Sequence, residues 1–317
     1  MRTGSVFAVI AFLCCGAWCA AAEPWLRLTT AHFELYTTAG EEVGRSLILS
    51  LERLRTSLQP VVEQRDERQK TVCIIAFGSR DEFQRYAPMS RSTGFFLPGA
   101  GRDFIVLDGP SGESRTAAHE YAHLVMSRGG FHLPAWLNEG LAELYSNLAD
   151  GRMGRFIPSR VLSLHRDGWI GLAELVSKSE VLTSPGSVDS AYAESWLLAH
   201  MLVLDPRYAG EFPGLLAALQ NSGTAEAFGQ VYGESIAQVE RDLKAYLEVG
   251  AANVRILAEP PRDAVERVDV EREADFDGRL ALAEMLRNYR GRAEESRDLY
   301  RQLDRDYPHR SDFPENR

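Results

Sequence analysis

The chain has few cysteines, and its basic residues are outnumbered by acidic ones. Only 4 of its 317 residues are cysteine, and three of these lie within the first 22 residues. The rest of the chain keeps only Cys73, so it has no intrachain disulfide, and Cys73 in the apolar run "TVCIIAF" is predicted to be a core residue. Lys and Arg number 35 against 45 Asp and Glu, a formal net charge of −10. This balance argues against nucleic acid or an anionic lipid surface as the main partner.

The chain also lacks an uncharged apolar run of the length that a membrane span requires. Its first 22 residues, "MRTGSVFAVIAFLCCGAWCAAA", combine one early positive charge with an apolar core and a small-residue end. Secretory signal peptides are built in this way, whereas a membrane anchor needs about 20 apolar residues. We therefore expect residues 1–22 to be removed after Ala22. The mature protein is then exported to the periplasm or the extracellular space, without stable membrane insertion.

Strand patterns come early in the chain and helical patterns come late. "WLRLTTAHFELYTT" predicts one or two strands, "KTVCIIAFG" a buried strand, and "STGFFLPGAGRDFIVLDG" a hairpin. Helices are expected over 41–64, after a cap at Ser79, and from Ser114 to Tyr246, where Gly and Pro mark the joints between them. This order predicts an α+β fold, in which an N-terminal mixed sheet with helices is followed by a mainly helical half.

From about residue 251 charged side chains become dense. After a linker, "AEPPRD", the segment "LALAEMLRNYRGRAEESRDLYRQLDRDYP" is similar to one tetratricopeptide repeat. Gly291 sits at its turn, and Ser296 and Tyr300 have the small-x3-aromatic spacing. A charged helical hairpin without kinship to that repeat is the alternative. One repeat cannot bury its own face, so it must pack on the preceding domain, pair with another chain or belong to a longer array.

The segment "RTAAHEYAHLV" carries two histidines four residues apart. On a helix such residues lie one turn apart on the same face, so His119 and His123 can aim ring nitrogens at one ion. Glu120 is rotated beside that ion, where its carboxylate can take a proton from a metal-bound water. The spacing predicts two ligands and a general base. The alternative is an ordinary helix that matches this short pattern by chance.

A catalytic zinc ion needs a third protein ligand and one open position. "LPAWLNEGLAELYSN" predicts a second helix, reached through a helix-ending pair of glycines. Fifteen residues separate His123 from Glu139, which is enough for a return that brings Glu139 over the histidines. Glu143 lies on the same face and is predicted to accept a hydrogen bond from the outer nitrogen of His119. Its alternative is an ordinary solvated helix residue.

The pair of motifs HEYAH and NEGLAE resembles the gluzincin metallopeptidases, the clan of thermolysin, and above all its small bacterial peptidase MA-like members. The resemblance implies a gluzincin catalytic core that holds one catalytic zinc ion between His119, His123 and Glu139. It also implies that Glu120 is the general base. An acidic residue four positions beyond the ligand glutamate is usual in this clan, and Glu143 has that position.

The same resemblance extends to Tyr192, in "SAYAESWLLAHMLVL", because these enzymes place a tyrosine in a helix after the ligand glutamate. It would stabilise the oxyanion of the transition state. Alternatively, Tyr192, Trp196 and His200 form one packed stripe, since they are spaced four apart. Gluzincins usually hold the substrate as an extra strand on a sheet edge, here expected along 94–96 or 104–107 of the hairpin.

Together these patterns predict an exported zinc metallopeptidase that hydrolyses a peptide or protein substrate with a zinc-activated water and Glu120 as base. Residues 1–22 are expected to be the signal peptide, 23–250 the peptidase MA-like catalytic domain, and 251–317 a linker with a helical hairpin. The alternative function is a catalytically silent adaptor that binds a protein partner through that hairpin. Glu120 argues against the adaptor, because a non-catalytic relative has no chemical need for it.

Overall fold

The computed structural model describes residues 24–62, 71–109, 114–130, 132–148, 152–250, 253–256 and 267–310. The predicted signal peptide and the segment "AEPPRD" lie outside these ranges. Within them, no helix has the length and apolar character needed to cross a membrane.

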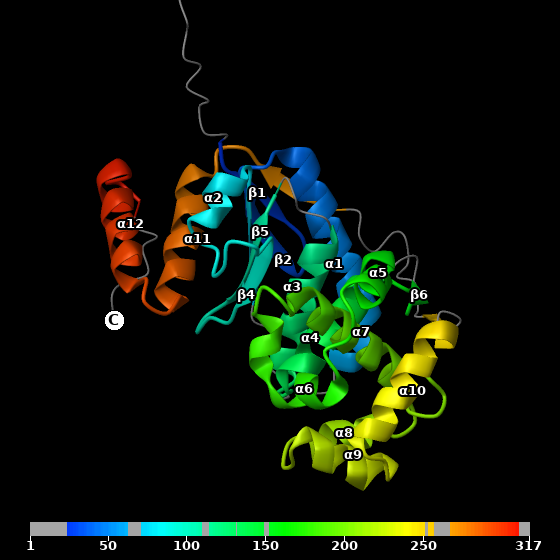
Figure 1. Cartoon of the computed structure of the whole chain (residues 1–317). Helices are drawn as coiled ribbons and strands as arrows, with labels where there is room; N and C mark the ends of the chain where they lie inside the picture. Colours follow the sequence, from blue (N-terminus) through cyan, green and yellow to red (C-terminus); the bar gives the residue numbers. More distant parts are fainter. Residues whose placement is uncertain are drawn as a thin grey trace, which may run out of the picture.

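Six strands form one mixed sheet in the order β4-β5-β3-β2-β1-β8 (Figure 1). They are β1 (Leu26–Thr29), β2 (Phe33–Thr37), β3 (Val72–Phe77), β4 (Gly94–Leu97), β5 (Asp103–Asp108) and β8 (Asp269–Glu271). The central strands β2, β3 and β5 run parallel, whereas β1, β4 and β8 are antiparallel to their neighbours. β3 is buried along its whole length, as expected for an apolar run without alternation. The α+β class, the N-terminal mixed sheet and the β4-β5 hairpin are confirmed.

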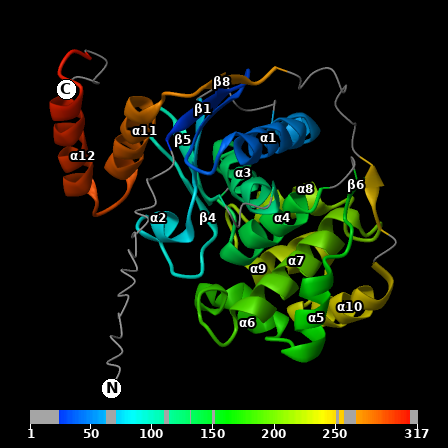
Figure 2. The ribbon, with the colours of Figure 1, turned by 90° about the horizontal axis from the view of Figure 1, so that it is seen from above.

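Helices cover both faces of this sheet (Figure 2). α1 (Glu41–Val62) and α3 (Ser114–Arg128) pack on one face, and α11 (Asp275–Asn288) packs on the other. The leucine stripe predicted for α1 is buried: Leu47, Leu51, Leu54 and Leu58. Burial of each leucine contributes roughly 1.5–3 kcal/mol, so this stripe fixes α1 against the sheet and α3. The short helix α2 (Arg80–Gln84) has the predicted cap, since Ser79 Oγ accepts from the Glu82 N–H at 3.3 Å.

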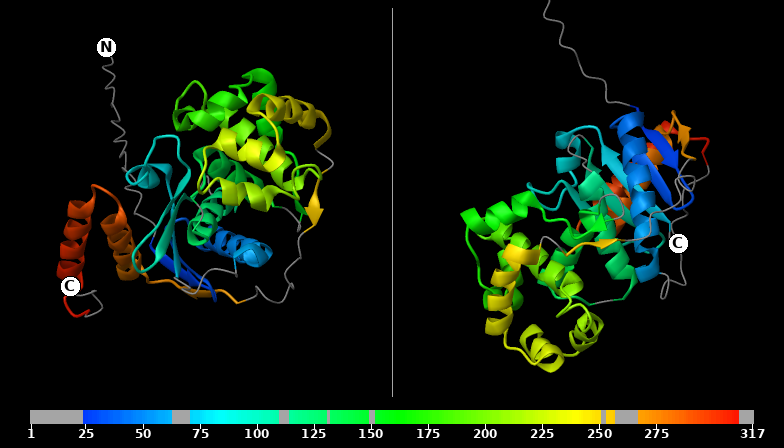
Figure 3. Two further views of the ribbon diagram at one scale, coloured as in Figure 1. Left: turned by 90° about the horizontal axis from the view of Figure 1, so that it is seen from below. Right: turned by 90° about the vertical axis from the view of Figure 1, so that its right-hand side faces the viewer.

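The helical half of the molecule lies beside α3 (Figure 3). It contains α4 (Ala135–Ser146), α5 (Pro158–Arg166), α6 (Leu172–Ser177), the 3-10 helix η1 (Ser179–Leu182), α7 (Val188–Leu204), α8 (Phe212–Ala218), α9 (Thr224–Tyr232) and α10 (Ile236–Val249). α7 is its buried centre, and α4 packs directly on it. Gly140 permits this approach, because a Cβ there would lie 2.2 Å from the Ser195 carbonyl oxygen. The glycine of the Asn-Glu-Gly motif therefore allows α4 to pack closely against α7.

One part of the helical prediction for 114–246 is wrong. A short strand, β6 (Arg152–Met153), interrupts the helices and pairs with β7 (Arg255–Ile256) in a separate two-stranded sheet. Two paired residues on each side make too short a ladder to leave a periodic signal in the sequence. The pairing brings the chain after α10 back toward α5.

The C-terminal segment forms the predicted helical hairpin, with α12 (Ala293–Asp306) packed against α11. Gly291 adopts φ +85° at the turn, and Ser296 Oγ donates to the Ala283 carbonyl at 2.7 Å. α11 packs on β1, β2 and β3, and β8 pairs with β1, so this segment completes the N-terminal sheet. Of the three arrangements expected for the hairpin, the structure shows the first, packing on the preceding domain.

Glu194 is a fully buried carboxylate in α7. Burial raises its pKa to about 7; Glu240 adds to this rise, while the backbone N–H groups of Ile170 and Gly171 and the charge of Lys244 oppose it. Since its pKa is higher in the folded chain than the ordinary 4.5, the folded state binds more protons than the unfolded state between these values. The contribution of Glu194 to stability is therefore lost as pH rises from about 4.5 to about 7.

The substitution Glu194→Gln should remove this pH dependence, because the amide keeps an acceptor oxygen without a charge. Above pH 7 we expect the free energy of unfolding to rise by up to about 3 kcal/mol relative to the parent chain, and at pH 4.5 to change little. Urea unfolding of both chains at pH 4.5, 6 and 8 measures the difference. An equal difference at all three pH values would contradict a titration of Glu194.

Candidate metal centre

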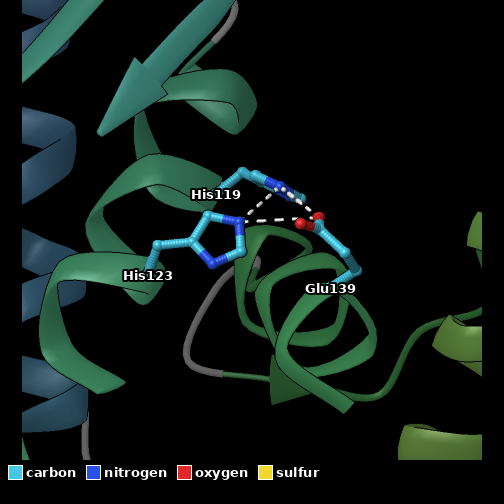
Figure 4. Close-up of side chains that lie close together, drawn as sticks. All are labelled: His119, His123 and Glu139. Carbon is cyan, nitrogen blue, oxygen red and sulfur yellow. Dashed lines mark hydrogen bonds and ion pairs between the residues drawn. The ribbon is translucent and has the colours of Figure 1, made fainter. Parts of the chain in front are cut away.

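His119 and His123 project from adjacent turns of α3 toward the same point (Figure 4). Their Nε2 atoms lie 3.1 Å apart. Glu139 reaches them from α4, with its Oε2 3.3 Å from His119 Nε2 and 3.5 Å from His123 Nε2. One ligand atom of each residue lies within 4.8 Å of the others. The structure thus brings together the three residues that the sequence predicts as metal ligands.

Local backbone features produce this meeting of two helices. α3 ends at Arg128, and Gly130 turns the chain with φ +67°, a conformation that favours glycine. α4 then begins directly after Pro134, whose fixed φ suits a helix start. Because α4 packs on α3 as well as on α7, Glu139 faces the histidines from a rigid element.

The electrostatics of this group favour a cation. Burial opposes a charge on His119, but Glu139, Glu120 and Glu143 outweigh it and hold the pKa of His119 above its ordinary value. Burial likewise opposes ionisation of Glu139, but the two imidazoles outweigh it and hold its pKa well below the ordinary range. The negative charges of Glu139, Glu120 and Glu143 therefore stabilise a positive charge at this point.

Two polar atoms of the group need a partner. Within the described part of the chain, Nδ1 of His123 is buried without a hydrogen bond, and the buried Oε2 of Glu139 has only its ion pairs with the two histidines, without hydrogen-bond geometry. A buried polar atom without a partner costs about 1–3 kcal/mol. A cation between the three side chains would satisfy Oε2 of Glu139, and two imidazoles with one carboxylate suit zinc with an open coordination position. The residues present therefore fit a zinc ion.

Glu143 lies behind His119, at the predicted place. Its Oε1 is 3.5 Å from Nδ1 of His119. This contact is an ion pair rather than a hydrogen bond, whereas Arg115 Nη2 and Arg160 Nη2 donate to the same carboxylate at 2.6 Å and 2.8 Å. Burial opposes its ionisation, but Arg160, His119 and Arg115 hold its pKa below the ordinary value. Glu143 is 5% exposed, so it is not a solvated helix residue.

Arg115 and Arg160 are the site residues that sequence reasoning missed. Arg115 comes four residues before His119 on α3, so the helical spacing that relates the histidines also places this guanidinium on their face. Arg160 comes from α5, a segment without any recognisable motif. Only the folded chain shows that it meets Glu143.

Glu120 is buried on the side of α3 that faces β4. A Cβ on Gly94 would lie 2.8 Å from Thr116 Cγ2 and 3.3 Å from Glu120 Cγ, so glycine lets the strand approach the helix. Burial raises the pKa of Glu120, although the two histidines and the backbone N–H of Phe96 favour its charged form. Its carboxylate is not part of the group formed by His119, His123 and Glu139.

Two cavities meet at this centre. One, of about 530 Å³, extends past His123 and the strand β4; the other, of about 420 Å³, extends past Arg115 and Arg160. Both are lined by Met89, Ser92, Gly94, His119, Glu120 and Tyr192. β4 is one of the two edge strands of the sheet, whereas β5 lies between β4 and β3. Of the two expected arms, only 94–96 therefore offers an open edge.

Tyr192 faces the cavities from α7. Arg160 Cζ lies 5.3 Å from the centre of its ring, and burial followed by the nearby charge of Glu139 raises its pKa. Trp196 and His200 are fully buried, with ring centroids 5.8 Å apart. Trp196 and His200 are thus part of the packed interior, while Tyr192 is half-buried, packs against the same cluster as Trp196 and also lines both cavities.

Comparison with known proteins identifies no relative: no protein-family model matches the chain, and a search of curated proteins finds no match. The likeness to gluzincins consequently stays with the motifs HEYAH and NEGLAE. What the chain does has to be argued from the arrangement of its own side chains.

Proposed function

We propose that the chain is an exported zinc-dependent metallopeptidase. The observation that carries the proposal is the convergence of His119, His123 and Glu139 from two packed helices on one point. Beside that point lie a buried carboxylate that is not a ligand, Glu120, and an open strand edge, β4. A metal site that served structure alone would have four closed ligands and no need of either feature.

Each residue has a task in peptide hydrolysis. His119, His123 and Glu139 would hold a zinc ion, which when bound would supply Lewis acidity toward the peptide carbonyl and the attacking water. Glu120 accepts a proton from the attacking water and delivers it to the leaving amine. Glu143 orients the ring of His119, and Tyr192 donates its O–H to the developing oxyanion. The free edge of β4 aligns the substrate backbone as an added strand.

Removal and return of zinc test the function. The chain without residues 1–22 should bind about one zinc ion and cleave members of a broad peptide library. A chelator should abolish cleavage, and stoichiometric zinc should restore it. Metal analysis and mass spectrometry of the peptides measure both quantities. Zinc bound with no cleavage of any peptide would overturn the peptidase proposal, and absence of zinc binding would overturn the metal site.

Tyr192→Phe should lower kcat by about 10²- to 10³-fold, which is the usual effect of removing one oxyanion donor. The phenyl ring keeps the packing against Arg160, so KM and zinc content should change little. Steady-state kinetics on one cleaved peptide separate kcat from KM. Tyr232→Phe, on α9, is a matched control, since that hydroxyl donates to the Tyr208 carbonyl at 3.3 Å. A kcat for Tyr192→Phe equal to that of the control would exclude the proposed role.

The adaptor alternative has less support. It needs a free binding face on the C-terminal hairpin, but α11 is already packed on the sheet. α12 is largely exposed apart from Ser296 and Leu303, so it is the part of the hairpin that an adaptor would have to use. The intact set of ligands and base at the metal centre has no task in an adaptor, so we favour the enzyme.

A further inference from the structure

We propose that the cavity of about 420 Å³ beside the metal centre is a subsite for a carboxylate of the substrate. We call it the arginine pocket and define it by the lining residues Arg115, Thr116, Glu143, Arg160, Pro185 and Val188. The inference rests on the proposed peptidase function and adds a substrate class to it, peptides with a negative charge next to the cleaved bond.

The position of the arginine pocket makes it part of the substrate path. It shares His119, Glu120 and Tyr192 with the cavity along β4. A peptide carbonyl at the metal centre would therefore have a neighbouring side chain or chain end directed into the pocket. A volume of about 420 Å³ falls within the range that holds a small organic group.

The inner wall of the pocket carries a net positive charge. Two guanidinium groups, of Arg115 and Arg160, meet the single carboxylate of Glu143 at 2.6 Å and 2.8 Å. Two positive charges against one leave a surplus of one. In the proposed enzyme Glu120 and Glu139 would not cancel this surplus, because the zinc ion held by His119, His123 and Glu139 would balance their two negative charges.

The rim of the pocket adds little to this charge. Arg91 and Asp189 both line the mouth and are both exposed, so they have opposite signs and are screened by water. We therefore expect the partly buried Arg115 and Arg160 to determine which substrate charge is preferred. Their side chains are 33% and 20% exposed for Arg115 and Arg160, which leaves each within reach of a ligand in the cavity.

Guanidinium geometry favours a carboxylate over other groups. Arginine presents five N–H donors in a planar fork that matches two carboxylate oxygens. Arg115 contacts Glu143 through Nη2 alone, so the same fork has the capacity to bind a second carboxylate. A lysine side chain of the substrate would be repelled by the surplus positive charge. An apolar side chain would leave the guanidinium N–H donors without an acceptor. An acidic side chain and the terminal carboxylate of a peptide offer the same chemistry.

Matched peptides test this selection on the zinc-loaded chain without residues 1–22. After mass spectrometry has located the cleaved bond in a library, Glu and Gln are compared at each flanking position. A second pair compares a C-terminal acid with its amide. We expect one of these pairs to favour the charged member by about 10- to 100-fold in kcat/KM, as hydrogen bonds to charged groups do. The first pair identifies an acidic side chain and the second a terminal carboxylate. Equal kcat/KM within both pairs would overturn the proposal.

Variants assign the preference to Arg115. In Arg115→Gln the ratio of kcat/KM for the favoured pair should fall to about one, whereas Arg115→Lys should keep most of it, because it retains the charge. Arg91→Gln, at the exposed rim, is the matched control and should leave the ratio as in the parent chain. Because the readout is a ratio between two peptides, a general loss of activity does not affect it. An unchanged ratio in Arg115→Gln contradicts the assignment.

Binding measurements test the carboxylate subsite independently of the peptidase function. The affinity of the same peptide pairs is measured calorimetrically on the zinc-loaded Glu120→Gln chain, with and without Arg115→Gln. A preference for the charged peptide that disappears with Arg115 supports the pocket even if the parent chain cleaves nothing. Cleavage of both peptides at equal rates, with equal affinities, overturns the pocket and leaves the peptidase proposal intact.

Discussion

Glu120→Gln should lower kcat/KM for peptide hydrolysis by about 10³-fold while the chain keeps its zinc. The amide is nearly the same size as the carboxylate, so it fits the buried space beside Gly94. It cannot accept the proton of the attacking water, however, and base catalysis is lost. Because Glu120 lies beside the ligands rather than among them, the affinity for zinc should change little.

Turnover of one cleaved peptide and the zinc content of the same preparation are the two measurements for Glu120→Gln. Glu226→Gln is a suitable control, because Glu226 is exposed on α9. Normal turnover in Glu120→Gln would remove this residue from the mechanism. Loss of zinc together with turnover would show instead that Glu120 is a ligand.

Glu139→Ala should weaken zinc binding by more than about 100-fold, the upper end of the loss seen when only a partner behind a ligand is removed. Only His119 and His123 then remain, and two imidazoles from one helix do not complete a zinc site. Hydrolysis should be lost as a consequence. Helix α4 should stay in place, since Gly140 and the apolar side chains of α4 hold it against α7.

Competition with a chromophoric chelator gives the zinc affinity of the Glu139→Ala chain. The rise of the melting temperature on zinc addition gives a second readout, because a ligand that binds only the folded state stabilises it. We expect this rise in the parent chain and in Glu180→Ala, an exposed control on η1. An equal rise in Glu139→Ala would refute its assignment as a ligand.

Much of the fold is predictable from the sequence because its signals are local. The leucine stripe of α1, the apolar run of β3 and the turn between β4 and β5 each depend on a spacing within a few residues. Ser79 caps α2 for the same reason. β8 and β6 are three and two residues long, and each pairs with a distant part of the chain. Strands this short have no periodic pattern in the sequence from which these pairings could be predicted.

The candidate site also contains residues that the sequence predicts and residues that only the structure shows. His119 and His123 are related by one helical turn, and Glu139 follows after a short connection, so spacing alone predicts that the three meet. Tyr192 is different, because its spacing from Trp196 and His200 is equally suited to a packed stripe. Trp196 and His200 are buried, whereas Tyr192 is half-buried and lines both cavities, so its role in the transition state stays a prediction. Arg160 itself has no sequence signal.

The amino-acid sequence by itself determined the class of the fold, the two helices that bring His119, His123 and Glu139 together, and the position of Glu120 next to His119. It did so because helical geometry converts a separation of four residues into a shared face. Tertiary structure alone decided that α11 and β8 complete the sheet, that β4 is an edge strand, and that two arginines converge on Glu143. These features depend on which distant segments bury their apolar faces together, and a linear pattern does not contain that information.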